Sequence, residues 1–356
     1  MPLLAVALSL VGSHYRPGPV RTADFTYDLP QPAIAQTPVE PRDASRLLRT
    51  SDLSDHWFRD LPDLLKPGDL VILNDTRVRA ARLEGRRLPG GGAVELLLLE
   101  RRPDDTWEAL ARPARKLRPG TQLDFDGLSA QILTRPDDGV VQVAFAPVAD
   151  IESAIEQAGE MPLPPYITSR LDRPERYQTV YARTTGSAAA PTAGLHFTDR
   201  VLTELTERGI GVARIELRVG LGTFRPITAE LVEDHVMHRE TYVLGVDAIE
   251  AISHTRDRGG AVVAVGTTTV RALETAWRHG EPEAGEATTD LFIAPGFEFR
   301  VVDRLVTNFH LPGSTLILMV AAFMGPGWRN AYEIALERRY RFLSFGDAML
   351  ADRAGP

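Results

Sequence analysis

The chain has 356 residues, 44% hydrophobic and 25% charged, which is typical of a folded globular protein. It contains no cysteine, which excludes disulfides, iron–sulfur clusters, thiolate zinc sites and cysteine nucleophiles. Its formal net charge of −8 argues weakly against nonspecific binding to nucleic acid.

The first residues resemble the apolar core of a signal peptide. They lack a positively charged start, however, and His14-Tyr15-Arg16 is a poor cleavage region. We therefore expect residues 1–22 to be either a mobile N-terminal extension or the result of a misassigned start codon. The apolar run 316–324 is much shorter than the roughly twenty residues that span a bilayer. We expect a cytoplasmic protein with no membrane partner.

Short apolar runs separated by turn signals fill residues 66–147. The separators contain Gly, Pro and Asp, as they do between the strands of small antiparallel barrels and sandwiches. The runs cover residues 69–73, 94–100, 107–111, 121–125, 130–134 and 140–146. This pattern predicts a small antiparallel β-barrel domain over residues 66–147.

Helical segments alternate with strands after Asp150. Asp150 and Thr198 are suited to cap helices over 151–158 and 199–208, and Asp247 with Glu250 resembles a capping box for 248–258. Further helices are predicted over 269–279, 315–324 and 331–340, with strands over 210–219 and 261–265. The alternation predicts an α/β fold with a largely parallel sheet, built from residues 23–65 and 148–356. The barrel is then an insertion, and the crevice between the two domains is the default ligand site.

Two loops of similar composition stand out, over residues 190–198 and 307–315. Each combines Gly, Pro and hydroxyl side chains with one histidine, His196 in the first and His310 in the second. This mixture suits neither a helix interior nor a strand, and shaped loops on a rigid scaffold often carry the chemistry of a protein.

A strand, a glycine and three threonines follow one another at Gly266, Thr267, Thr268 and Thr269. The first N–H groups of a helix point outward there and favour an anion such as a carboxylate or phosphate. Threonines that only cap the helix are the alternative. A second glycine-rich segment over 220–224 is weaker, because it lacks the third glycine and the helix of a dinucleotide fingerprint.

Three further features each allow two interpretations. The stiff segment 161–166 ends in Tyr166, which could form a wall for a planar or cationic ligand or end a rigid linker. Structural or acid–base histidines are favoured over a metal site, because His235 and His238 lack metalloprotease spacing. Four cations lie within seven residues and are called the basic cluster below: Arg112, Arg115, Lys116 and Arg118. They could form a surface that contacts phosphate groups, or simply a solvated face of the barrel.

Taken together, the motifs resemble the S-adenosylmethionine:tRNA ribosyltransferase-isomerase family of queuosine biosynthesis. The matching segments run in order from about residue 22 to 350. They include residues 24–30, 66–69, 74–77, 162–166, 177–181, 191–198, 235–240, 265–274, 307–315 and 340–349.

The resemblance implies an α/β domain with an inserted β-barrel. It also implies transfer of the ribosyl part of S-adenosylmethionine to 7-aminomethyl-7-deazaguanine at the tRNA wobble position, which releases adenine and methionine and leaves epoxyqueuosine. S-adenosylmethionine is then a substrate, and neither a cofactor nor a metal is expected.

Such chemistry needs proton transfer, a site for the sulfonium and a site for the methionine carboxylate. We expect His310 and His196 to transfer protons, with His238 as a third candidate. Tyr166 and Phe197 are expected to face the sulfonium. The carboxylate is expected to bind at residues 266–269, and the basic cluster is expected to contact tRNA.

Three departures from the family pattern stand out. The N-terminal extension has no counterpart in the family, the stretch 49–57 is short, and Arg218 stands where the family usually carries histidine. A relative that uses S-adenosylmethionine on a different acceptor is therefore the first alternative. A tRNA-binding protein without catalysis and a metal-dependent hydrolase are the others.

Overall fold

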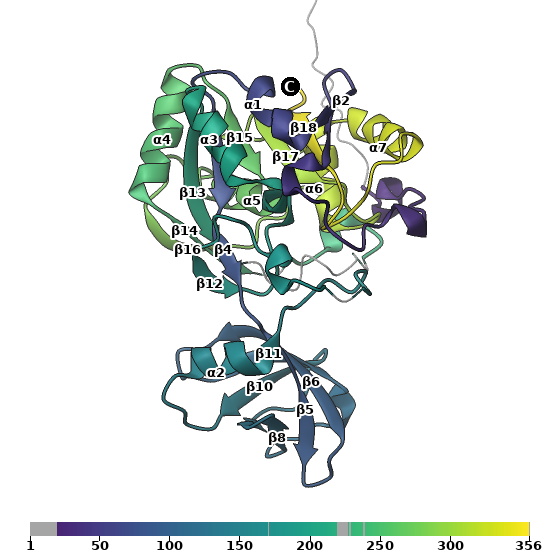
Figure 1. The fold of residues 1–356 in the computed structure, drawn as a ribbon, viewed down its shortest axis with the longest axis vertical. Helices are drawn as coiled ribbons and strands as arrows, with labels where there is room; N and C mark the ends of the chain where they lie inside the picture. Colours follow the sequence, from purple (N-terminus) through teal and green to yellow (C-terminus); the bar gives the residue numbers. More distant parts are fainter. Residues whose placement is uncertain (1–19, 170, 219–226, 228, 238, 356) are drawn as a thin grey trace, which may run out of the picture.

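The computed structural model describes residues 20–169, 171–218, 227, 229–237 and 239–355. Two β-structures dominate this part of the chain, a large sheet with helices and a small barrel below it in the view of Figure 1. Most of the predicted N-terminal extension, the segment 220–224 and His238 lie outside the described residues.

The large sheet has nine strands, and the four in its middle are mutually parallel. Outside this block the pairing is antiparallel, except that β1 runs parallel to β18. Across the sheet the order is β16 (Gly285–Thr289), β14 (Glu240–Leu244), β13 (Gly211–Leu217), β3 (Leu70–Asn74), β15 (Val262–Val265), β17 (Arg304–Asn308), β18 (Ala348–Asp352), β1 (Arg46–Arg49) and β2 (Ser54–Trp57).

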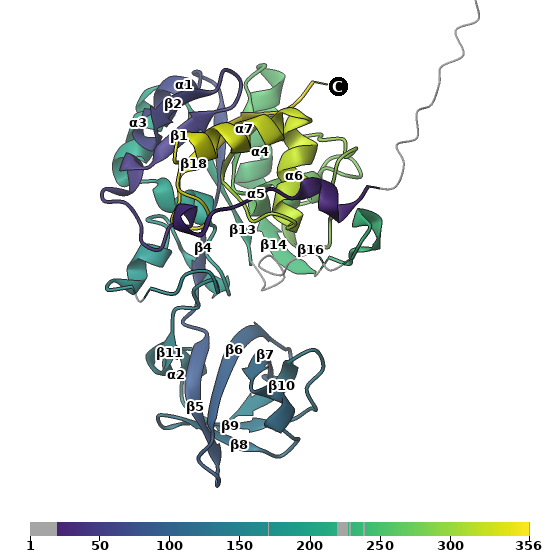
Figure 2. The same cartoon turned by 90° about the vertical axis from the view of Figure 1, so that its right-hand side faces the viewer.

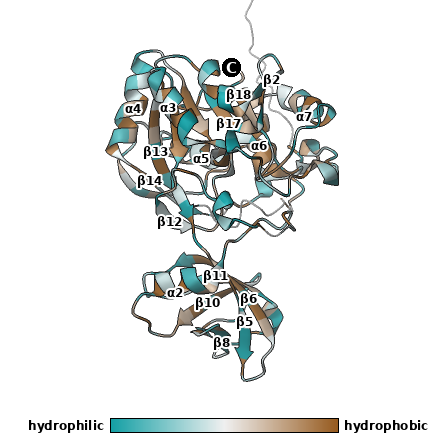
Figure 3. Cartoon of the chain, in the orientation of Figure 1, coloured by the Kyte–Doolittle hydropathy of each residue, from teal (hydrophilic) through white to brown (hydrophobic). Residues whose placement is uncertain are grey.

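Helices cover both faces of this sheet. Alternate residues of β3 point to opposite faces, so Leu70 and Ile72 join one core cluster while Val71 and Leu73 join another. The first cluster includes side chains of α4 (Val246–Asp257), α5 (Thr267–Ala276) and α6 (Thr315–Met324), and the second includes those of α1 (Leu61–Leu64) and α3 (Asp199–Glu207). Helix α7 (Gly327–Glu337) packs beside α6. Figure 3 shows the resulting pattern of hydrophobic strands beneath helices with hydrophilic outer residues.

Six antiparallel strands form the barrel, which closes through pairing of its first strand with β8. Gly85 permits this closure, because a Cβ there would lie only 2.3 Å from the carbonyl oxygen of Asp124. In barrel order the strands are β5 (Arg82–Leu88), β6 (Ala93–Arg101), β7 (Trp107–Arg112), β10 (Val140–Phe145), β9 (Leu128–Ile132) and β8 (Gln122–Phe125). Strand β11 (Gly159–Glu160) pairs with β5, and α2 (Ile151–Ala158) precedes it.

The predicted α/β fold with an antiparallel barrel is confirmed, but one strand was assigned to the wrong sheet. Residues 69–73 were expected in the barrel, whereas β3 lies in the large sheet between β13 and β15. All five residues of β3 are buried, as expected for a central parallel strand covered on both faces. The barrel strands therefore span 82–145 rather than 66–147. Where one domain ends and the next begins stays a prediction.

Local signals placed several helices correctly. Helices α2 and α6 have the predicted bounds, and the Asp150 side chain accepts a hydrogen bond from the Ser153 N–H at 3.2 Å. The capping-box prediction is wrong, because α4 begins at Val246 after Gly245 and has no side-chain cap. No helix within the described ranges is long and apolar enough to cross a membrane.

Candidate active site

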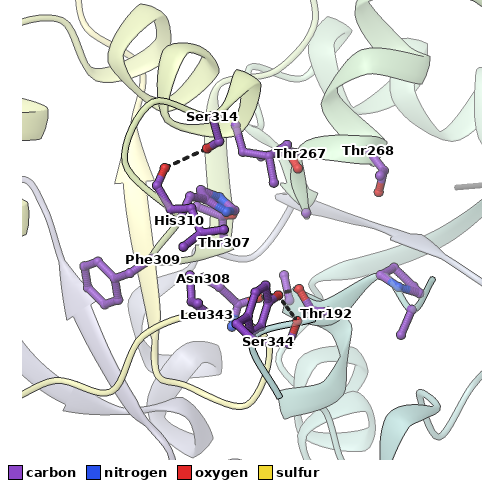
Figure 4. Close-up of a pocket in the computed structure, with 17 residues that line it drawn as sticks. Thr192, Thr267, Thr268, Thr307, Asn308, Phe309, His310, Ser314, Leu343 and Ser344 are labelled. Carbon is purple, nitrogen blue, oxygen red and sulfur yellow. Dashed lines mark hydrogen bonds between the residues drawn. The ribbon is translucent and has the colours of Figure 1, made fainter. Parts of the chain in front are cut away.

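A cavity of ≈ 70 Å³ lies where the parallel strands β15 and β17 end. Ligands of open α/β sheets commonly bind at such carboxyl ends. Its walls come from residues 190–193, 266–268, 307–311, 343 and 344, with Tyr166, Ser314 and Leu316. Figure 4 shows labelled side chains from these segments around the pocket.

The start of α5 forms one wall of this pocket. Gly266 precedes the helix with φ of +90°, a conformation that favours glycine, and it lines the pocket with Thr267 and Thr268. The buried Oγ1 atom of Thr268 has no hydrogen-bond partner among the described residues. Thr269 was expected to contact the ligand, but it does not line the pocket. Its hydroxyl points back and donates to the Val265 carbonyl at 2.7 Å. Three of the four predicted residues therefore line the pocket.

A second helix start faces the same cavity. Ser314 caps α6 by accepting from the Ile317 N–H at 3.4 Å, and its hydroxyl donates to the Leu311 carbonyl at 2.7 Å (Figure 4). The residues described around the pocket include no lysine, arginine, aspartate or glutamate. The local field is therefore set by two helix N-termini and by neutral polar groups, and it favours an anion.

His310, the first candidate for proton transfer, lines the pocket. Its Nε2 atom lies 2.8 Å from Thr307 Oγ1, and burial lowers the pKa of the imidazole to about 3. The backbone is fixed on both sides, because its N–H donates to the Tyr332 hydroxyl and its carbonyl accepts from the Tyr27 hydroxyl. His310 is thus a neutral, firmly placed imidazole that can accept a proton.

His196 lies behind the pocket rather than in its wall, contrary to its expected position. It belongs to the short turn η7 (Thr192–His196), where Nδ1 lies 2.7 Å from Ser45 Oγ and Nε2 lies 3.1 Å from Asn308 Nδ2. Its ring stacks on Phe58, and burial lowers its pKa to about 3. Both ring nitrogens are occupied by protein groups, so His196 has no direct access to a ligand in this cavity.

The two aromatic candidates also differ in position. Tyr166 lines the pocket, its hydroxyl lies 2.7 Å from Ser344 Oγ, and burial raises its pKa to about 12. Phe197 does not line the pocket, contrary to its expected position, because it is fully buried and packs edge-on against Phe58 in the core beside α3.

Known proteins resemble this chain over nearly its whole length. A family model described as "Queuosine biosynthesis protein" matches residues 22–351. The chain belongs to this family. It is 52% identical to the S-adenosylmethionine:tRNA ribosyltransferase-isomerase of Symbiobacterium thermophilum, over 93% of this chain and 99% of that protein. The enzyme of the same name from Clostridioides difficile is 46% identical with the same coverage. The crystal structure of S-adenosylmethionine tRNA ribosyltransferase from Thermotoga maritima is 40% identical, covers 92% of this chain and 99% of that one, and has a TM-score of 0.52.

In this family member the basic cluster is exposed at the end of the barrel away from the large sheet (Figures 1 and 2). Strand β5 turns back into β6 at this end, and Arg112 pairs in register with Glu95 near the start of β6. None of the four cations forms a salt bridge within the described residues. The structure therefore separates them from the pocket while leaving them open to an anionic partner.

A larger cavity of ≈ 760 Å³ lies between the barrel and the large sheet, where a crevice was predicted. Six arginines line it, and four of these pair with nearby carboxylates: Arg79, Arg101, Arg102 and Arg218. Arg218, the departure from the family pattern, contacts Glu216 at 2.7 Å and Glu286 at 3.3 Å.

Two groups of residues were not predicted from the sequence. Thr192 and Asn308 lie in the two selected loops but were not chosen, although a hydroxyl and an amide beside the histidines were a usable signal. Arg271 and Glu240 form a buried ion pair that joins α5 to β14, and Glu240 also lines the larger cavity. Their separation of 31 residues gave no local signal.

Proposed function

We propose that this protein transfers and isomerises the ribosyl group of S-adenosylmethionine onto 7-aminomethyl-7-deazaguanine at the wobble position of tRNA. The products are epoxyqueuosine-tRNA, adenine and methionine, and the reaction takes place in the cytoplasm without a cofactor or metal. The observation that carries the proposal is a pocket with two helix N-termini and a neutral histidine, in a chain that matches the queuosine biosynthesis family over residues 22–351.

The start of α5 is suited to the methionine carboxylate. Its outward N–H groups favour an anion. The Thr268 hydroxyl, which has no partner within the described ranges, supplies a further donor. The cavity of ≈ 70 Å³ is small beside the roughly 300 Å³ or more of pockets that enclose a drug-sized ligand. We therefore assign the methionyl and sulfonium part of the substrate to it, with Tyr166 beside the sulfonium.

Of the described residues in the pocket wall, only His310 and Tyr166 have side chains that titrate as acids or bases. The sulfonium acidifies the neighbouring C5′–H bond of the ribose, and we assign removal of that proton to His310, which lines the pocket. When Nε2–H donates to Thr307, Nδ1 carries the free lone pair. General base catalysis of this kind contributes about 10²–10⁴-fold.

Mass spectrometry of nucleosides tests this function directly. Purified protein is incubated with S-adenosylmethionine and tRNA bearing 7-aminomethyl-7-deazaguanine, with the H310Q variant as the matched control. We expect epoxyqueuosine together with an equal amount of adenine. Binding of S-adenosylmethionine without product would favour a different acceptor, and R218H, which restores the usual family residue, then tests that alternative. Binding of tRNA alone would indicate a non-catalytic protein.

A further inference from the structure

A chain of polar side chains runs from the buried interior to the pocket wall. Ser45 Oγ lies 2.7 Å from His196 Nδ1, and His196 Nε2 lies 3.1 Å from Asn308 Nδ2. Asn308 Oδ1 lies 2.9 Å from the Thr192 hydroxyl, and Asn308 and Thr192 both line the cavity. The mechanism proposed above uses none of these four groups.

The direction of each hydrogen bond follows from one fixed acceptor. The carbonyl oxygen of Asp347 lies 3.4 Å from Asn308 Nδ2 and can only accept, so the amide nitrogen must face it and His196. Nε2 of His196 is then the acceptor, and its Nδ1–H donates to Ser45. The other amide atom of Asn308, Oδ1, can only accept, so the Thr192 hydroxyl donates its proton to Oδ1.

The Thr192 hydroxyl oxygen can therefore only accept a hydrogen bond from a ligand. Its neighbour Ala193 packs against the start of α5, since a Cβ on Gly266 would lie 3.8 Å from Ala193 Cβ. A ligand carboxylate at the start of α5 would thus lie near Thr192. In an amino acid the ammonium group and the carboxylate share one carbon atom, so an ammonium beside a carboxylate bound at the start of α5 is within reach of Thr192.

We infer that the chain from Ser45 to Thr192 holds the Thr192 hydroxyl as a hydrogen-bond acceptor for the α-ammonium group of the substrate's methionine moiety. This inference rests on the proposed function. It makes Thr192 a specificity residue, and His196 and Asn308 positioning residues that act through it. No carboxylate is described in the pocket wall, so neutral acceptors must carry this contact.

Calorimetric binding to T192V and T192S tests the contact. The ligands are S-adenosylmethionine and an analogue in which hydrogen replaces the α-amino group. A hydrogen bond to a charged group predicts about 10- to 100-fold weaker binding of S-adenosylmethionine to T192V. T192S, which keeps the acceptor, should bind nearly as well as the wild type. The analogue should bind T192V and the wild type equally.

The outcomes separate the two proposals. An equal loss for both ligands in T192V, with wild-type binding intact, overturns the ammonium contact and leaves the proposed function standing. Failure of the wild type to bind S-adenosylmethionine overturns both. A ¹⁵N NMR measurement of the His196 tautomer tests the chain itself: a proton on Nδ1 supports the assigned directions, and a proton on Nε2 overturns them.

Discussion

Lowering the pH should destabilise this protein through its buried histidines, and His196 offers the clearest test. Burial lowers the pKa of His196 to about 3, whereas an unfolded chain titrates this group near about 6.5. Below that value the unfolded state binds a proton that the folded state does not. The free energy of unfolding should therefore fall as the pH falls, by about 1.4 kcal/mol per pH unit, until the folded-state pKa is reached.

The loss of stability follows from the difference between the pKa values of the folded and unfolded states. Between about pH 6.5 and about pH 5 the loss from His196 is about 2 kcal/mol. His310 has the same lowered pKa and contributes a similar loss, so the two together weaken the fold by about 4 kcal/mol. Above the unfolded-state pKa both histidines are neutral in the folded and unfolded states, and this loss of stability does not occur.

Urea unfolding at about pH 7 and about pH 5, followed by tryptophan fluorescence, measures the loss. The H196Q variant is the matched comparison, because a glutamine amide can still accept from Asn308 and donate to Ser45. Its stability should fall about 2 kcal/mol less than that of the wild type over this range. Buried carboxyls with raised pKa, such as Asp347 and Glu274, are present in both proteins and cancel in the difference. Equal losses in the two proteins would refute the assignment of His196 as a buried neutral group.

Three further changes test other parts of the structure. In a turnover assay H310Q should lower the rate by about 10²–10⁴-fold while S-adenosylmethionine binding is kept, and an unchanged rate would remove His310 as the base. F197A should lower the free energy of unfolding in urea by about 3–5 kcal/mol, because it leaves a cavity in the core. A variant that keeps full stability but binds the ligand more weakly would contradict the placement of Phe197 in the core. Neutralising the basic cluster should reduce the salt dependence of tRNA binding by about 0.7–0.9 in logarithmic slope for each lost phosphate contact, and an unaltered slope would exclude these cations as contacts.

Features with a local cause were predictable from the sequence. The side chains of Asp150 and Thr198 accept from N–H groups three residues later, as their positions before apolar periodic segments predict. Strand β3 was assigned to the wrong sheet because its neighbours in space are distant in the sequence. Leu70 pairs in register with Gly211 and with Val262, whereas the barrel follows β3 almost directly along the chain. Its unbroken apolar run was the one signal of a strand buried on both faces.

The site shows a different limit. Composition selected both loops that line the pocket, yet it did not distinguish the positions of their histidines, because irregular loops have no period from which side-chain direction follows. His196 ends a turn that places it against Phe58 and Ser45, while His310 is the second residue after β17 and lines the cavity. Neighbouring residues in one loop can therefore belong to the core and to the site, as Phe197 and Thr192 do.

The absence of charged side chains from the described pocket wall is consistent with the chemistry proposed for it. A sulfonium is an alkylating group, and a carboxylate held against it would be a competing nucleophile. Hydroxyl oxygens, an aromatic ring and a weakly basic imidazole stabilise the cation without this hazard, while two helix N-termini attract the carboxylate of the same ligand. Under the proposed function, the burial that makes His310 a weak base thus also keeps it neutral, so that it does not repel the sulfonium before the C5′ proton is removed.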